Sequence, residues 1–324
     1  MNIAIPKEIK DSERRVALTP SHVAKLARVH TVYVGAHAGH ACGYTDDDYR
    51  VAGAEIVSNG DAYANADLIV KVKEPLAGEV HQMKAGATVF SYLHLAAALE
   101  TKLAMENHAV RGIPFEAVTD DDGAFPLLKP MSVIAGQLSA IEAEQILLKN
   151  KGRKLDNAKV LVYGGGVAGT AAALACRDRG AQVSVIDKSD AAIARLNLLG
   201  FLAYHPPGKE FMTEVLKGVD VIIGAVLIPG REAPHVLHEE HMSIMPDGGV
   251  FVDIAIDQGG CSTTSKPTVH SNPTYDVNGI THYCVTNMPG KAYRDATDVL
   301  SDAIFPYVEI LATDVYGLDH FREV

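Results

Sequence analysis

Short apolar runs alternate with stretches of helical spacing along the first part of this chain. Runs rich in branched and aromatic residues predict strands, and they fall at residues 2–5, 31–35, 66–72, 88–93 and 113–118. Helical patterns lie between some of them, at residues 20–28 and 96–107. Strands that alternate with helices indicate βαβ units and a mostly parallel sheet.

A long helix and a second alternating series follow. Ser132 is a predicted N-cap. The helix then runs to about Asn150 with one apolar face, formed by Ile134, Leu138, Ile141 and Leu148. Charged residues at 151–157 end it, and further strands are predicted at residues 160–163, 182–186, 220–226, 249–255 and 282–285. A last helix, at residues 298–311, follows the second sheet, and we expect it to return to the first domain. The pattern therefore predicts an α/β protein of two doubly wound, Rossmann-like parallel-sheet domains with a cleft between them.

Composition and charge narrow the class of protein. The chain has 324 residues, of which 48% are hydrophobic and 21% charged, as in ordinary water-soluble proteins. A net charge of −11 argues against a nucleic-acid partner, because basic surfaces bind phosphate backbones. The four cysteines are far apart, which indicates buried free thiols in a reducing compartment. We recognise no leader and no apolar run of membrane length, and so expect no membrane partner and a cytoplasmic location.

One motif combines several features of a dinucleotide site. An apolar strand runs into Gly164, Gly166 and Gly169, an alanine-rich helix follows, and a second strand ends on Asp187. The glycines allow a tight turn, close approach of the backbone to a pyrophosphate, and close packing of helix on strand. The helix N-terminus offers free N–H groups to phosphates. Asp187 can accept hydrogen bonds from the adenosine ribose and would repel a 2′-phosphate, which favours NAD over NADP. The alternative is a glycine-rich turn in an ordinary α/β fold.

Cations at strand ends are candidates for binding an acid, because ligands of open α/β sheets bind beyond the carboxyl ends of the strands. Lys73 closes one predicted strand and could hold a carboxylate or carbonyl oxygen, or be a solvated turn residue. Arg15 follows the first strand and could grip a carboxylate with two parallel hydrogen bonds. Its neighbour Arg14 carries the same charge, and residue type alone does not choose between them.

Two further strand ends carry groups suited to proton transfer. His94 follows an apolar strand, where it could donate and accept protons or be a structural histidine. Asp257 follows another strand and precedes two glycines, with Asp253 as its competitor and turn capping as the alternative role. We recognise no metal-ligand spacing and no nucleophile motif. The residues together indicate a dinucleotide-dependent oxidoreductase that acts on a small carboxylic acid.

Several longer and unusual segments stand out between residue 2 and about residue 290. They are PKEIKDSERRVALTP, ADLIVKVKEPL, YLHLAA, IGAVLIPGREAP, VDIAIDQGGC and HYCVTNMPG. In sequence and in order they resemble the alanine dehydrogenase family, which shares its fold with the NAD-binding subunit of proton-translocating transhydrogenase. The resemblance implies oxidative deamination of L-alanine to pyruvate and ammonia with NAD, and the reverse reaction. It also implies a homo-oligomer and no metal.

The resemblance also implies roles for individual residues and domains. Arg15 and Lys73 would bind the substrate, and His94 and Asp257 would handle protons. The cofactor would lie against Ser132, Gly164, Gly166, Val167, Ala168, Gly169, Asp187, Val226, Leu227, Ile228, Asn287 and Met288. Residues 1–130 and 296–324 would form the substrate and catalytic domain, and residues 131–295 the NAD-binding domain.

The chain departs from the family pattern around the lid and the cofactor loops. Val133 and Thr263 stand where the family usually has glutamate. The loop at residues 151–157 is short and charged, and residues 291–296 differ from the run that the family usually has at that place. The sequence also stops early relative to the family pattern. These departures leave open another small amino acid or an opine as substrate, or a non-catalytic NAD-binding regulator. A transhydrogenase subunit ranks lower, since it would need an NADP-binding partner and a membrane component.

Overall fold

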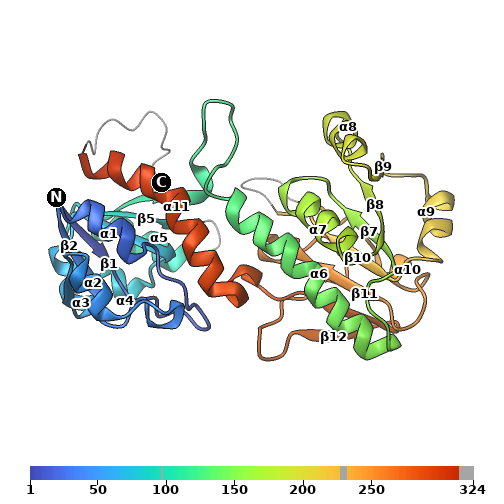
Figure 1. Ribbon diagram of the computed structural model, residues 1–324, viewed down its shortest axis with the longest axis horizontal. Helices are drawn as coiled ribbons and strands as arrows, with labels where there is room; N and C mark the ends of the chain where they lie inside the picture. The colour runs from blue at the N-terminus through green and yellow to red at the C-terminus, as the bar shows by residue number, and fades with distance from the viewer. Residues whose placement is uncertain (96–97, 227–231, 314–324) are drawn as a thin grey trace. The chain divides into compact units, whose positions relative to one another are not determined.

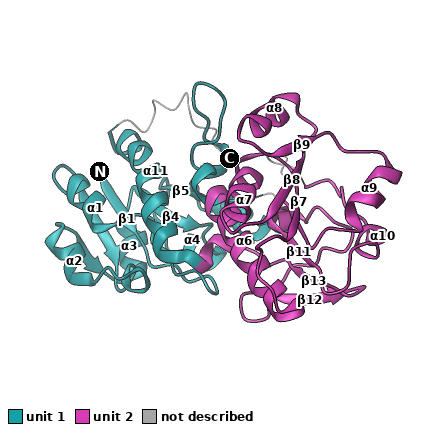
Figure 2. Cartoon of the chain, turned by 45° about the vertical axis from the view of Figure 1, so that its right-hand side comes forward, with its two compact units in different colours: residues 1–131, 292–324 teal, residues 132–291 magenta. Residues whose placement is uncertain are grey.

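The computed structural model describes residues 1–95, 98–226 and 232–313 (Figure 1). The chain forms two compact units, drawn in separate colours in Figure 2. Unit 1 contains Met1–Met131 and the described residues from Ala292 onward, and unit 2 contains Ser132–Lys291.

Unit 1 is built on a parallel sheet of six strands in the order β3-β2-β1-β4-β5-β6. The strands are β1 (Asn2–Ile5), β2 (Thr31–Gly35), β3 (Glu55–Val57), β4 (Leu68–Lys73), β5 (Thr88–Tyr92) and β6 (Arg111–Pro114). The order of the strands reverses between β1 and β4, which is the point where doubly wound sheets bind ligands.

Helices join these strands, and a late helix completes the unit. They are α1 (Pro20–Leu26), η1 (His40–Cys42), α2 (Asp46–Val51), α3 (Asn59–Asn65), α4 (Ala77–Val80), α5 (Leu99–Asn107), η2 (Phe115–Ala117) and α11 (Tyr293–Thr313). The hydroxyl of Thr297 on α11 accepts the Val16 N–H at 3.2 Å, and that of Ser301 accepts the Thr19 N–H at 3.0 Å. The expected return of the last helix to the first domain is therefore confirmed.

Unit 2 repeats the same sheet order and adds a hairpin. Its strands run β12-β13-β11-β10-β7-β8-β9 and are parallel except for β12. They are β7 (Lys159–Tyr163), β8 (Gln182–Ile186), β9 (Leu202–Tyr204), β10 (Val221–Gly224), β11 (Val250–Asp253), β12 (Thr274–Val277) and β13 (Ile280–Tyr283). Asn278 and Gly279 form the two-residue turn between β12 and β13, with φ of 51° and 78°, as type I′ hairpins require.

The helices of unit 2 begin with the long segment expected from the sequence. They are α6 (Lys129–Lys151), α7 (Val167–Arg177), α8 (Asp190–Leu198), α9 (Lys209–Leu216), α10 (Glu239–Met242), η3 (Ile254–Gln258) and η4 (Met288–Ala292). On one face of this sheet, Leu161, Ile222 and Phe251 from three adjacent strands are fully buried in one core. Neighbouring strands thus fix the loops at their carboxyl ends.

The structure corrects several predicted element boundaries, and the last helix, expected from residue 298, begins at Tyr293. Ser132 is not an N-cap, since α6 already begins at Lys129, and Pro130 is tolerated because the first helical turn needs no N–H donors. The strand expected at residues 113–118 ends at Pro114 and continues as the turn η2. The helix expected from residue 96 is α5, which begins at Leu99, while residues 96 and 97 lie outside the described part of the chain. The prediction of buried free thiols is confirmed for all four cysteines.

Candidate functional site

The carboxyl edge of the sheet in unit 1 gathers three of the predicted residues. Arg15 lies in the loop after β1, Lys73 ends β4, and His94 follows β5 by two residues. These strands are neighbours and parallel, so their carboxyl ends meet at one edge. The structure therefore brings Arg15, Lys73 and His94 to the same end of one sheet.

A bulge in β4 positions Lys73. The pairing of β4 with β5 shifts register between Val70 and Lys73, which leaves backbone N–H groups without partners in the ladder. The carboxylate of Glu8 accepts the N–H of Val72 at 2.7 Å and that of Lys73 at 3.4 Å. Lys73 itself is half-buried. The strand end that carries it is thus held by a side chain from the β1 loop.

Glu8 belongs to a buried charge cluster that the sequence analysis missed. The ammonium of Lys71 lies 3.3 Å from Glu8 Oε2 and 3.1 Å from Glu79 Oε1, and the three side chains are 1%, 3% and 4% exposed. Lys71 also donates to the Tyr63 hydroxyl at 3.3 Å. Burial alone lowers the pKa of Lys71, but the two carboxylates outweigh it and raise that pKa. Burial raises the pKa of Glu8 more than the neighbouring ammonium of Lys71 lowers it.

Arg15 is buried, whereas Arg14 is exposed. The Glu13 carboxylate accepts from Arg15 Nε at 2.7 Å and from Arg15 Nη2 at 2.6 Å, and Arg15 Nη1 lies 3.1 Å from the Met131 sulfur. Arg14 instead places its guanidinium 5.5 Å from the centre of the Tyr293 ring. The structure therefore favours Arg15 over Arg14 as the cation at the sheet edge, with Glu13 fixing its orientation.

His94 is held in an unusual backbone conformation by a neighbouring carboxylate. Its φ is 43°, in the left-handed region that residues other than glycine rarely adopt. Glu116, just beyond β6, accepts the backbone N–H of His94 at 2.6 Å, and its carboxylate lies 3.6 Å from His94 Nδ1. The imidazole stacks on Tyr92, with ring centres 6.1 Å apart, and is 44% exposed. Glu116 was missed because it lies within the strand predicted at residues 113–118, whereas β6 ends at Pro114 and leaves Glu116 in the turn η2.

The glycine loop of unit 2 has the geometry that its motif predicts. Gly164 has a φ of 103°, and a Cβ there would lie 2.5 Å from the Ala225 carbonyl oxygen. A Cβ on Gly169 would lie 1.7 Å from the Gly164 carbonyl oxygen, whereas one on Gly166 would meet nothing within 4 Å. The N-terminus of α7 begins at Val167 without a side-chain cap. An open face beside uncapped N–H groups is suited to a phosphate.

Asp187 lies against this loop at the end of β8. One carboxylate oxygen accepts the Gly165 N–H at 2.6 Å, and the other accepts the Ser189 N–H at 2.7 Å. The side chain is half-buried. The strand, turn, helix, strand and acid predicted from the sequence are thus assembled around one loop.

Asp257 and Asn287 form a second group in unit 2. Both carboxylate oxygens of Asp257 lie near the Asn287 N–H, at 3.0 and 3.2 Å, and Asn287 has a φ of 54°. Asp257 is exposed. Asp253 is buried and accepts the N–H groups of Ala255 and Cys261, both at 2.9 Å. Asp253 therefore organises the turn after β11 and leaves Asp257 as the accessible acid.

The other expected cofactor residues are placed individually. Val167 is exposed and Ala168 half-buried in the first turn of α7, Ser132 is half-buried in the first turns of α6, and Met288 is buried at the start of η4. Val226 follows β10, and its backbone nitrogen would lie 3.0 Å from a Cβ on Gly164. Leu227 and Ile228 lie outside the described residues.

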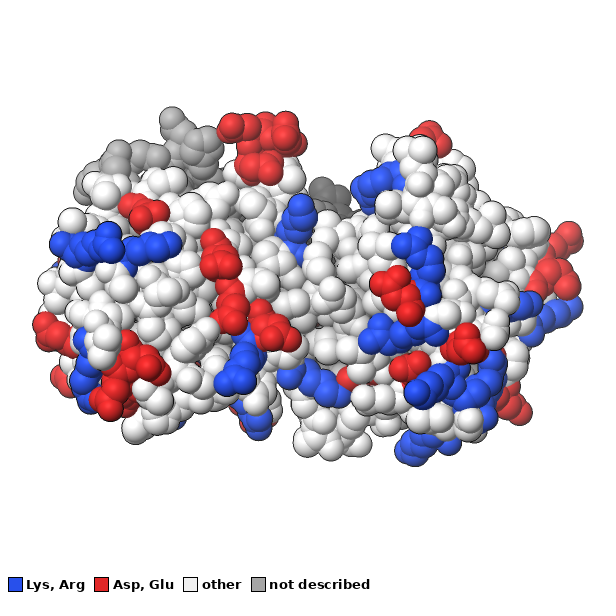
Figure 3. Space-filling model, viewed as in Figure 1, with Lys and Arg blue, Asp and Glu red and all other residues white. Residues whose placement is uncertain are grey.

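Both signs of charge are found on the surface of the protein. Basic and acidic side chains are interspersed on the face drawn in Figure 3, without a continuous basic stripe there. Among the described residues, every helix is too short or too polar to reach across a lipid bilayer.

Comparison with known proteins identifies relatives over nearly the full chain. The model described as Alanine dehydrogenase/PNT, N-terminal domain matches residues 4–135, and that of the C-terminal domain matches residues 132–321. An alanine dehydrogenase from Halomonas elongata is 43% identical over 96% of this chain and 88% of its own length. A solved L-alanine dehydrogenase aligns with a TM-score of 0.91 at 39% identity, covering 99% of this chain and 91% of that one. A transhydrogenase from Sinorhizobium meliloti aligns with a TM-score of 0.86 at 26% identity, covering 96% and 94%. The resemblance seen in the sequence is therefore confirmed, and this chain belongs to the alanine dehydrogenase/PNT family.

Proposed function

We propose that this protein catalyses the reversible, NAD-dependent oxidative deamination of L-alanine to pyruvate and ammonia. The observation that carries the proposal is identity of 40–43% with alanine dehydrogenases over 96–98% of the chain. The groups that such a reaction needs, a substrate cation pair, a histidine and an accessible carboxylate, lie at the end of a strand or in the segment that follows one. A pure NAD-binding module has no need of all of them.

Unit 1 supplies the substrate-binding residues of this proposal. Arg15 is the partner for the carboxylate of alanine or pyruvate, because a guanidinium matches a carboxylate with parallel hydrogen bonds. Glu13 accepts from Nε and Nη2 of Arg15, and Nη1 lies beside the Met131 sulfur, so the guanidinium is held in a fixed orientation at the sheet edge. Lys73 then places a positive charge near the oxygen that becomes the carbonyl, where negative charge develops as the carbinolamine hydroxyl loses its proton and the amine departs.

Proton transfer is assigned to His94 and Asp257. In deamination, hydride leaves the substrate Cα and the resulting imine takes up water. His94 accepts a proton from that water and returns one to the departing amine, so that pyruvate and ammonia are released without net change at the imidazole. Glu116 is a positioning residue, since it holds the His94 backbone and stands beside Nδ1. Asp257 is the second proton-accepting group of the proposal.

NAD is the proposed cofactor, and when bound it supplies the nicotinamide C4 that accepts or donates the hydride. The residues present fit it: Gly166 leaves space for a pyrophosphate, the N-terminus of α7 is uncapped, and Asp187 closes the following strand. An acid at this position hydrogen-bonds the ribose in dinucleotide sites and disfavours a 2′-phosphate. Ser132, Val226, Asn287 and Met288 complete the proposed cofactor surface.

The test of the reaction is NADH oxidation with pyruvate and ammonium, alongside glyoxylate and bulkier 2-oxo acids. We expect turnover only when both pyruvate and ammonium are present. The control is His94→Ala, which should lose turnover while still binding NADH, as followed by fluorescence. Undiminished activity in that variant would remove His94 from the chemistry. Preference for a bulkier acid would replace alanine with another amino acid or an opine, and NADH binding without any turnover would favour a regulator.

The cofactor assignment is tested separately with Asp187→Ala. Loss of this carboxylate should weaken NAD binding and relax discrimination against NADP by roughly 1–3 kcal/mol, the usual effect of removing a charged hydrogen-bonding group. An unchanged ratio of NAD and NADP affinities would show that Asp187 does not face the ribose. Assembly into a homo-oligomer is also proposed, and light scattering on the purified chain tests it.

A further inference from the structure

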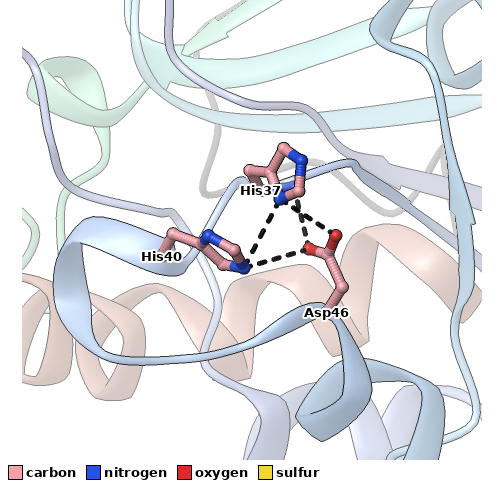
Figure 4. A group of neighbouring side chains, drawn as sticks. All are labelled: His37, His40 and Asp46. Carbon is pink, nitrogen blue, oxygen red and sulfur yellow. Dashed lines mark hydrogen bonds and ion pairs between the residues drawn. The ribbon is translucent and has the colours of Figure 1, made fainter.

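Three potential metal ligands, none of which has been assigned a role above, meet on the surface of unit 1. His37 and His40 lie between β2 and α2, and Asp46 is the first residue of α2 (Figure 4). One ligand atom from each lies within 4.8 Å of the other two. Among the described residues, these are the three His, Cys, Asp or Glu side chains whose ligand atoms lie close enough together to hold one metal ion.

The distances between the donor atoms suit a single small cation. His37 Nδ1 is 3.4 Å from His40 Nε2 and 3.2 Å from Asp46 Oδ2, and His40 Nε2 is 4.0 Å from Asp46 Oδ1. A tetrahedral zinc ion with bonds of about 2.0–2.1 Å places its ligands about 3.3–3.4 Å apart. Two of the three separations, 3.4 and 3.2 Å, are close to this value, and rotation of one exposed side chain brings in the third.

The local fold holds the three ligands in place. Asp46 Oδ1 accepts the His37 backbone N–H at 2.8 Å, which orients the carboxylate and leaves Oδ2 facing the imidazole. The Thr45 side chain caps α2 by accepting the Asp48 N–H at 3.1 Å. His37 has a φ of 64°, a conformation that is uncommon for residues other than glycine. This backbone geometry turns its ring toward His40.

The chemistry of the donors selects the class of ion. Two imidazole nitrogens and one carboxylate oxygen suit zinc and similar divalent transition ions, whereas calcium and magnesium prefer oxygen ligands alone. The side chains of His37 and His40 are 60% and 49% exposed, and that of Asp46 is 15% exposed. We propose that His37, His40 and Asp46 form a binding site for a divalent transition cation of the zinc type, with water completing the coordination. This site goes beyond the proposed dehydrogenase function and does not depend on it.

A cation here would stabilise the contact between this loop and the C-terminal helix. The same loop carries Cys42, whose sulfur lies 3.1 Å from the Thr297 hydroxyl of α11, and the Cys42 carbonyl accepts from Arg294 Nε at 3.1 Å. The Tyr44 hydroxyl donates to Asp298 on the same helix. Fixing His37, His40 and Asp46 therefore closes a loop whose other side packs on α11. A cation that binds only the folded chain raises its stability.

The experiment uses the untagged full chain after dialysis against a chelator. Co²⁺ is titrated while the visible absorption bands of the bound ion are recorded, and Zn²⁺ is titrated by calorimetry. We expect one Co²⁺ per chain with the strong bands of tetrahedral coordination, and a rise in melting temperature with Zn²⁺. His37→Gln, His40→Gln and Asp46→Asn should each weaken Zn²⁺ binding at least about tenfold, since losing even an outer-shell partner weakens a metal site 10–100-fold.

A second pair of surface histidines provides the matched control. His81 Nδ1 and His108 Nε2 lie 2.9 Å apart, but the described residues offer no carboxylate to complete a group of three there. His81→Gln with His108→Gln should therefore change Zn²⁺ affinity less than about twofold. All variants are checked for folding by circular dichroism. The proposal is overturned by absence of Co²⁺ and Zn²⁺ binding, by binding that survives the three ligand variants, or by equal loss in the control.

Discussion

Replacing Lys71 with methionine tests the buried charge cluster behind the proposed substrate site. The substitution keeps the length of the side chain and removes the ammonium that lies 3.3 Å from Glu8 and 3.1 Å from Glu79. Both carboxylates then remain buried without their counter-charge. Glu8 also accepts the N–H of Val72, so the perturbation reaches the strand end that carries Lys73.

The expected loss of stability is large. Removing one partner of a buried ion pair lowers the free energy of unfolding by about 3–5 kcal/mol, and here the lost ammonium serves two carboxylates. The loss should depend on pH. Burial raises the pKa of Glu8, so the folded chain binds a proton more readily than the unfolded chain. The free energy of unfolding of the variant therefore falls as pH rises above about 4.3, the ordinary pKa of glutamate. Its loss relative to the unsubstituted chain is smaller near about pH 5 than at neutral pH.

Hydrogen–deuterium exchange of the β1 and β4 peptides measures this loss locally, which avoids assuming that the two units unfold together. A deficit of 3–5 kcal/mol corresponds to exchange that is faster by about two to nearly four powers of ten. Lys84→Met is the matched control, because Lys84 pairs with Asp67 on the surface, where the side chains are 43% and 36% exposed. That pair should contribute less than about 1 kcal/mol. Equal exchange in the two variants would refute the argument that the Lys71 cluster stabilises this sheet.

Three further predictions concern the two units. Gly169→Ala should abolish NADH binding and lower the melting temperature, because its Cβ would lie 1.7 Å from a carbonyl oxygen, while Gly166→Ala should weaken NADH binding and leave the melting temperature within a few degrees. If both variants bind NADH normally, the glycine loop is not the phosphate site. Glu116→Gln should lower kcat roughly tenfold without changing NADH affinity, because it weakens a charge-assisted hydrogen bond to His94; the pH profile of kcat should shift as well, and an unchanged profile would contradict this positioning role. Burial lowers the pKa of His282, so below about pH 6.5, the ordinary pKa of histidine, the unfolded chain binds a proton more readily than the folded chain. The free energy of unfolding of unit 2 should therefore decline as pH falls below about 6.5. Urea denaturation followed by circular dichroism at several pH values tests this, and NMR titration of the His282 ring with a pKa near about 6.5 would contradict it.

Local patterns in the sequence located most strands and the glycine loop because both depend on residues that are close in the chain. The predicted strands at 2–5, 31–35 and 182–186 match β1, β2 and β8 residue for residue. The short strands β3, β9 and β12 were missed. None of them contains more than one fully buried residue, so they carry little of the hydrophobic pattern on which strand prediction rests.

In the candidate site, too, the sequence indicated some residues and left other choices open. The sequence indicated Lys73, His94 and Asp257 because each follows an apolar strand, and the family resemblance selected Arg15. It could not choose Arg15 over Arg14, or Asp257 over Asp253, from residue type. The structure shows that Arg15 is buried beside Glu13 and that Asp253 is used in turn hydrogen bonds, and the choice of Arg15 and Asp257 as site residues stays a prediction.

What the sequence determined by itself is the order of the elements, the glycine motif and the family, since these follow from residues that are neighbours in the chain. Only the tertiary structure decided which distant side chains meet. Lys71 pairs with Glu8, from which 62 residues separate it in the chain, and Glu116 reaches His94 from the turn after the next strand. The cluster of His37, His40 and Asp46 also needed the folded loop, because a left-handed residue turns the rings together. Such contacts depend on strand order and backbone conformation, which hydrophobic periodicity does not encode.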